Sequence, residues 1–176
     1  MAEQRISYVD PATISDQKML AELCRCRREG TPRPESQAIR AHVPAAFWSF
    51  ADTWEAVFRN GVMDHPIKEL CRVYVSQFVE CNYCMVQRSV QSGPGKIAET
   101  KYADLLRYAD SDDYTEREKT ALTYTNAIIW DESIADDALW AKLHEHGADE
   151  ELVELGFFVG LTLGQQRWIK TLGLGH

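Results

Sequence analysis

Apolar side chains recur along the chain at the three- and four-residue spacing of helices, and no stretch alternates between apolar and polar residues as a strand would. Phe47, Phe50, Trp54 and Phe58 form one such stripe. We predict a core or interface position for it, with the wall of a substrate pocket as the alternative. The whole pattern predicts an all-α protein of about seven or eight helices.

Prolines, glycines and capping residues mark the ends of these helices. Pro66 opens the helix that carries Glu69, and Thr115 with Glu118 makes a capping box. The predicted helices follow the capping residues Ser15, Thr115 and Asp149 or begin at Pro44, Pro66, about Cys81, Lys96 and Ala135. All but the last are expected to end near Glu29, Phe58, Glu80, Ser92, Tyr108, Ile129 and Glu145.

The length and charge of the chain limit the number of domains and the kinds of partner that we expect. A chain of 176 residues fits one domain, and no linker divides it. A net charge of −8 and a pI near 5.1 argue against nucleic acid or an anionic membrane as a partner. The N-terminus lacks a secretory signal and no apolar run is long enough to span a bilayer, so we expect a soluble, cytoplasmic protein.

Five cysteines, an odd number, indicate reduced thiols rather than a disulfide framework. Cys81 and Cys84 form a Cys-x-x-Cys pair, Glu69 precedes it by twelve residues, and Arg88 follows it by four. If Cys81, Cys84 and Arg88 share a helix, their spacing places all three on one stripe. Residues of these types at this spacing indicate a thiol redox site, with no cofactor and no metal.

The segment KELCRVYVSQFVECNYCMVQRSV resembles the carboxymuconolactone decarboxylase and AhpD-like alkylhydroperoxidase family, whose redox members carry Glu, eleven residues, Cys-x-x-Cys, three residues and His. Glu69, Cys81 and Cys84 match this pattern. Arg88 stands at the His position, and an arginine cannot act as a proton shuttle at neutral pH. The resemblance covers roughly residues 40–172. It implies an AhpD-like helical bundle over a single domain, 1–176, with residues 1–40 as a helical N-terminal extension.

The same resemblance implies a homo-oligomer that acts as a peroxiredoxin-type, antioxidant thiol peroxidase or as a disulfide oxidoreductase. The catalytic residues would be Cys81, Cys84, Glu69 and Arg88. Its partners would be a peroxide or disulfide substrate and a thiol reductant. With Arg88 in place of the family's His, we expect a reactive dithiol with weak turnover.

The site requires the chain to reverse between Glu69 and the thiols. On one continuous helix, twelve residues would separate Glu69 from Cys81 by about 18 Å. No glycine or proline marks a turn in SQFVEC, but the family resemblance implies a helical hairpin that turns near Phe78 to Glu80 and brings Glu69 opposite Arg88. A thiol at a helix start near a cation has a lowered pKa, but the sequence leaves open which sulfur attacks.

Three alternatives stay open. The protein could be a lactone decarboxylase or another non-redox enzyme on the same fold, although such an enzyme does not need two thiols. Cys24 and Cys26 could join the Cys-x-x-Cys pair in a four-thiolate zinc site or a redox sensor. His42 or His65 could replace the missing proton carrier.

Two further expectations concern packing. Cys71 has apolar neighbours and is expected in the core. Gly156, Gly160 and Gly164 form a smooth face on the last helix, which predicts close helix contact within a subunit or between subunits.

Overall fold

The computed structural model describes residues 4–92 and 97–174, and every regular element in these ranges is helical. The α-helices are α1 (Gln17–Glu29), α2 (Pro34–Arg40), α3 (Pro44–Thr53), α4 (His65–Phe78), α5 (Asn82–Met85), α6 (Glu99–Ala103), α7 (Glu116–Ile129), α8 (Asp137–His146) and α9 (Asp149–Thr171). A π-helical segment, Trp54–Arg59, extends α3, and short 3-10 turns cover Pro11–Thr13, Val90–Ser92, Leu105–Asp110 and Glu132–Ile134. The all-α prediction is confirmed.

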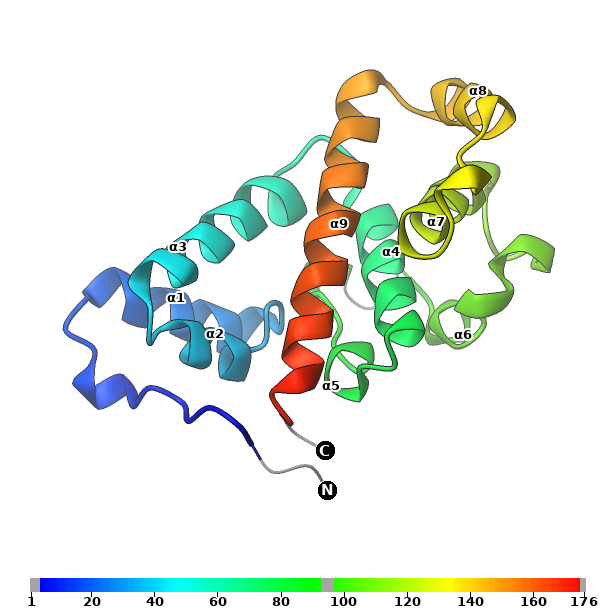
Figure 1. Cartoon of the computed structure of the whole chain (residues 1–176). Helices are drawn as coiled ribbons and strands as arrows, with labels where there is room; N and C mark the ends of the chain where they lie inside the picture. The colour runs from blue at the N-terminus through cyan, green and yellow to red at the C-terminus, as the bar shows by residue number, and fades with distance from the viewer. Residues whose placement is uncertain (1–3, 93–96, 175–176) are drawn as a thin grey trace.

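Helices α4, α7 and α9 pack against one another and hold the main core, while α1 to α3 lie on the other side of α9 (Figure 1). Leu70 of α4, Leu122 of α7 and Leu155 of α9 are all buried in this core. Burying a leucine side chain contributes about 2 kcal/mol, so the contact among these helices dominates the stability of the fold. The short helix α5 lies beside the C-terminal end of α9 (Figure 1).

The aromatic stripe predicted from the sequence is buried. Phe47 packs with residues of α1, and Phe50, Trp54 and Phe58 pack with Phe158 of α9. Phe58 and Phe158 stack with ring centroids 5.2 Å apart. The stripe therefore joins the N-terminal helices to the central three.

Several helix boundaries follow the predicted capping chemistry. Gly30 ends α1 with a φ of 74°, and the capping box of Thr115 and Glu118 starts α7. Asp16, rather than Ser15, caps α1, because its carboxylate accepts the N–H groups of Lys18 and Met19.

Several predicted boundaries were wrong, including the end of the Cys-x-x-Cys helix, which lies at Met85 rather than near Ser92. Helix α2 lies in a region that we expected only to end the first helix, because Pro34 suits a first helical turn. The helix predicted from Lys96 to Tyr108 is broken near Asp104, and Lys96 itself lies outside the described residues. Ala148, rather than Asp149, precedes the first turn of α9, and its N–H donates to Glu151.

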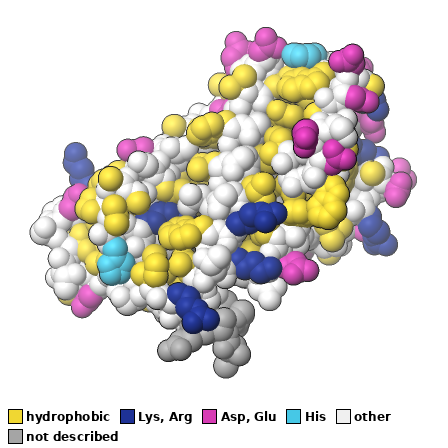
Figure 2. Space-filling model, viewed as in Figure 1, with side chains coloured by type: hydrophobic (Ala, Val, Ile, Leu, Met, Phe, Trp, Pro, Cys, Tyr) yellow, Lys and Arg dark blue, Asp and Glu magenta, His cyan; other side chains and the backbone are white. Residues whose placement is uncertain are grey.

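The glycines of α9 differ in their surroundings. A Cβ on Gly156 would lie 2.9 Å from the Tyr124 hydroxyl of α7, so this glycine permits a close helix contact within the chain. Gly160 and Gly164 have open space around them. Figure 2 shows hydrophobic side chains gathered on one face of the molecule, and the exposed ones include Val153 and Phe157 of α9. The expected oligomer stays a prediction.

Among the described residues, no helix combines the length and the apolar character needed to cross a membrane.

Candidate active site

A tight turn reverses the chain between α4 and the cysteines. Helix α4 ends at Phe78, Glu80 adopts a φ of 52°, and the Cys81 N–H donates to the Ser76 carbonyl over 3.0 Å. A left-handed conformation costs a residue other than glycine on the order of 1 kcal/mol, and here no glycine is present to relieve it. The predicted reversal of the chain near Phe78 to Glu80 is confirmed.

A buried ion pair holds the two arms of this hairpin together. Nε and Nη2 of Arg72 donate to the two Glu69 oxygens over 2.7 and 2.9 Å, and the two side chains are only 2% and 0% exposed. The same guanidinium donates to the carbonyls of Cys84 (3.1 Å) and Gln87 (2.7 Å). The Ser89 N–H donates to Glu69 over 2.9 Å. Glu69 therefore acts through Arg72 to position the segment that carries the thiols.

The prediction that Arg88 faces Glu69 was wrong. Arg88 donates to the Glu99 carboxylate over 3.1 and 3.2 Å and lies over the Tyr102 ring. The reason is that α5 ends at Met85, so Arg88 does not continue the helical stripe on which the prediction relied.

Sequence reasoning missed Arg72, although a signal for it existed. Arg72 follows Glu69 by three residues, a spacing at which helical side chains meet. Its neighbours Leu70, Cys71 and Val73 are apolar, which indicates a buried helix and hence a buried pair.

The two thiols of the Cys-x-x-Cys pair influence each other's pKa. The Cys84 N–H donates to the Cys81 carbonyl over 2.8 Å, which places the residues one helical turn apart. Hydrogen bonding from Cys84 lowers the pKa of Cys81 although burial opposes this, and Lys170 and Arg33 lower it further. Donating this hydrogen bond, together with burial, raises the pKa of Cys84. The pair thus loses its first proton easily and holds its second. This arrangement favours Cys81 as the resting thiolate.

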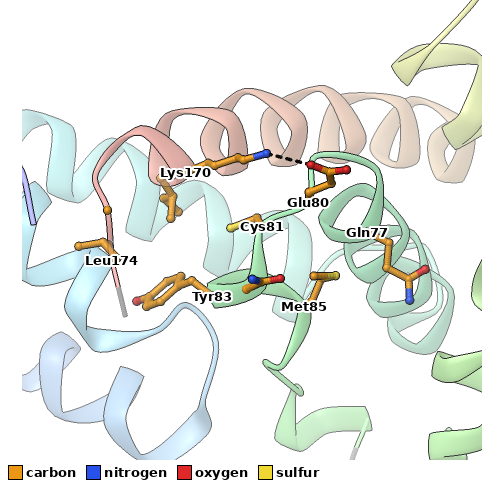
Figure 3. Close-up of a pocket in the computed structure, with 10 residues that line it drawn as sticks. Gln77, Glu80, Cys81, Tyr83, Met85, Lys170 and Leu174 are labelled. Atoms are coloured by element: carbon orange, nitrogen blue, oxygen red, sulfur yellow. Dashed lines mark ion pairs between the residues drawn. The ribbon is translucent and has the colours of Figure 1, made fainter. Parts of the chain in front are cut away.

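Cys81 lines an open pocket of about 590 Å³ between α5 and the end of α9. Figure 3 shows its sulfur between the Lys170 and Tyr83 side chains. Lys170 Nζ donates to the Val79 carbonyl over 2.8 Å and lies 3.6 Å from a Glu80 oxygen. A small electrophile in this pocket would meet the sulfur with the lowered pKa, beside an ammonium group.

Cys84 lines a different cavity. This small space of about 30 Å³ lies among α2, α3, α4, α5 and α9, and Arg72 and Trp54 also line it. The two sulfurs of the pair therefore face separate spaces.

The other cysteines lie apart from this pair. Cys24 is exposed, and Cys26 and Cys71 are buried, which raises the pKa of each buried thiol to about 12. The core position expected for Cys71 is confirmed. No group of three or more His, Cys, Asp or Glu residues in the described ranges is arranged to hold a metal ion, so the four-thiolate site is not formed.

The two histidines weighed as proton carriers have other contacts. His42 bonds to the Ser7 carbonyl over 2.8 Å. His65 bonds to the Phe58 carbonyl and to the Ser89 hydroxyl, each over 2.9 Å. Because the Ser89 N–H donates to Glu69, these contacts connect His65 to the carboxylate side of the site.

The pH dependence of alkylation tests the state of the thiol pair. We expect the rate of iodoacetamide modification of Cys81 to reach half its maximum below pH 9.0, the usual pKa of a thiol. Replacing Cys84 by alanine removes the S–H donor and should move this midpoint to higher pH. Mass spectrometry of tryptic peptides identifies the modified residue. An unchanged or lower midpoint in Cys84→Ala would contradict the proposed hydrogen bond.

No family model matches the sequence. Two uncharacterized proteins from two strains of Mycobacterium tuberculosis are 29% identical over 102 residues, which is 58% of this chain but 36% of their length. The chain therefore spans about a third of the curated relatives that it matches.

Solved structures give a fuller match. A peroxidase-related protein of Ralstonia eutropha with an alkylhydroperoxidase AhpD core has a TM-score of 0.76 at 18% identity, over 98% of this chain and 91% of its own. A peroxidase-related protein of Silicibacter has a TM-score of 0.77 at 13% identity, over 99% and 94%.

A variant of the debrominase Bmp8, in complex with 2,3,4-tribromopyrrole, has a TM-score of 0.79 at 16% identity, over 98% of this chain and 93% of its own. The fold thus occurs in proteins of more than one activity. Likeness at these identities shows the fold, and the fold of this chain is that of the AhpD-like, peroxidase-related proteins.

Proposed function

We propose that the protein is a thiol-dependent peroxidase or disulfide oxidoreductase that uses Cys81 and Cys84 as a redox pair. The observation that carries this proposal is the position of Cys81, one helical turn before Cys84 and on the wall of an open pocket. This arrangement provides an attacking sulfur, an adjacent resolving thiol and access for a substrate. The peroxidase-related proteins with the same fold support the assignment.

In the peroxidase reaction, the Cys81 thiolate attacks one oxygen of a hydroperoxide and the O–O bond breaks. The leaving alkoxide takes a proton and departs as an alcohol, and Cys81 becomes a sulfenic acid. The Cys84 sulfur, as it loses its proton, attacks Cys81, the S–S bond forms, and hydroxide leaves and takes that proton as water. An external thiol reductant then restores the pair by exchange.

The surrounding charges have distinct roles in this scheme. Lys170 lies at the pocket wall, where its ammonium group can stabilise the leaving alkoxide. Glu69 and Arg72 are positioning residues, because they fix the backbone at Cys84. Arg88 points toward Glu99, so we assign it no part in proton transfer.

The non-redox alternative on this fold is less well supported. A decarboxylase-type reaction does not require two adjacent thiols, whereas a dithiol redox cycle does. The thiol pair thus favours the redox reading.

Peptide mapping after mild oxidation tests the proposal. On addition of one equivalent of hydrogen peroxide to the reduced protein, we expect the Cys81–Cys84 disulfide to form first, because a thiolate and a resolving thiol are already paired. Cys24 is the internal control, since it is exposed while Cys81 is only 3% exposed. If exposure alone governed oxidation, Cys24 would react first. Prior oxidation of Cys24, or no disulfide between Cys81 and Cys84, would refute the proposed function.

A further inference from the structure

Arg40 is a buried cation without an acidic partner. The residue is 5% exposed, and its guanidinium donates to the side-chain oxygens of Gln37 (2.9 Å) and Gln165 (2.7 Å). No carboxylate within the described ranges forms an ion pair with it. Burial lowers the pKa of Arg40 to about 10, so it keeps its charge at neutral pH. A buried charge of this kind is costly unless an opposite charge compensates it.

The guanidinium stands between two spaces. On one side is the small pocket of about 30 Å³ that Cys84 also lines. On the other is a groove of about 470 Å³ between α3 and α9, which opens to the surface. Arg40, Phe50 and Gln165 line both spaces, so the groove and the small pocket adjoin at these residues.

Two buried residues that line the small pocket carry hydrogen-bond donors with no partner among the described residues. Trp54 is 5% exposed and Thr162 is 2% exposed, and both line this pocket. Neither the Trp54 Nε1 nor the Thr162 Oγ1 has a hydrogen-bond partner among the described residues. Unpartnered buried donors cost about 1–3 kcal/mol each, and an oxyanion beside Arg40 would accept from them.

The groove is mainly apolar and carries one charge. Ala46, Phe157, Leu161 and Trp168 supply its apolar walls, and among the residues that the structure describes Arg40 is the only charged one that lines it. The Phe50 and Trp168 rings flank the guanidinium, with centroids 3.8 and 5.0 Å from its central carbon. These rings fix the orientation of the cation while leaving its charge uncompensated.

We propose that this groove binds an organic carboxylate with an apolar chain, with the carboxylate on Arg40 and the chain along the walls of α3 and α9. The single buried cation matches one negative charge, the unpartnered donors match its oxygens, and the apolar walls match its chain. The site is separate from the open pocket at Cys81, so it does not depend on the proposed redox function.

Binding of decanoate tests this assignment. Decanoate below its micellar concentration should quench tryptophan fluorescence saturably, since Trp54 and Trp168 line the two spaces, and equilibrium dialysis of labelled decanoate gives its stoichiometry. We expect one site per chain. The uncharged 1-decanol should bind at least tenfold more weakly, because it cannot pair with the guanidinium.

Two variants locate the site. Arg40→Met should weaken decanoate binding at least tenfold, whereas Arg167→Met, the same change at an exposed arginine of helix α9, should leave it unchanged. If Arg40→Met does not fold, Ala46→Trp decides, because Ala46 is exposed and a tryptophan there would fill the groove. Equal affinity for decanoate and 1-decanol, undiminished binding in Arg40→Met, or undiminished binding in Ala46→Trp would each overturn the proposal.

Discussion

Replacing Arg72 by methionine should lower the free energy of unfolding by about 3–5 kcal/mol, the usual cost of leaving one partner of a buried ion pair alone. The change leaves the Glu69 carboxylate without its cation at 0% exposure. It also removes the donor to the carbonyls of Cys84 and Gln87. Urea unfolding followed by circular dichroism measures the loss.

Arg88→Met is the matched control, because it removes the same group from the other arginine near the site. The Arg88 and Glu99 side chains are 32% and 74% exposed, and an exposed pair of this kind contributes at most about 1 kcal/mol. A loss in Arg88→Met as large as that in Arg72→Met would contradict the assignment of the buried pair.

Replacing Cys81 by serine should lower the rate of peroxide turnover by a factor on the order of a thousand or more, because the attacking atom is removed. Turnover is measured as peroxide consumed in the presence of a dithiol reductant. Cys24→Ser is the control and should keep the wild-type rate, since Cys24 lies outside the site.

Cys84→Ser separates the two thiols. The variant should still react once with peroxide and stop at the Cys81 sulfenic acid, which dimedone labels. If instead Cys81→Ser retains this first step and Cys84→Ser loses it, Cys84 is the attacking sulfur and the assignment of roles is reversed.

The sequence predicted the helices better than it predicted the contacts of the site. Gly30 and the Thr115 capping box act through local backbone chemistry, so their positions could be inferred from neighbouring residues alone. The break near Asp104 could not be inferred in this way, because no proline or glycine marks it.

Part of the candidate site was predicted from the sequence, and part depends on contacts between distant segments. The reversal before Cys81 was implied only by the family resemblance, because no glycine or proline marks the turn at Glu80. The partner of Glu69 depends on where α5 ends, and α5 spans only Asn82–Met85, too short for its periodicity to place Arg88. The different surroundings of the two sulfurs arise from α2, α3 and α9, which the local sequence does not reveal.

The hydrogen bonds from Arg72 to the carbonyls of Cys84 and Gln87 bear on how the site changes during a cycle. They fix the main chain on the C-terminal side of the thiols, while the Ser76 carbonyl fixes the N–H of Cys81. Closing the sulfur–sulfur bond is then left to side-chain rotation over a stationary backbone. Oxidised and reduced forms would share one backbone, so the reorganisation energy between them would be small and the pair could cycle without partial unfolding.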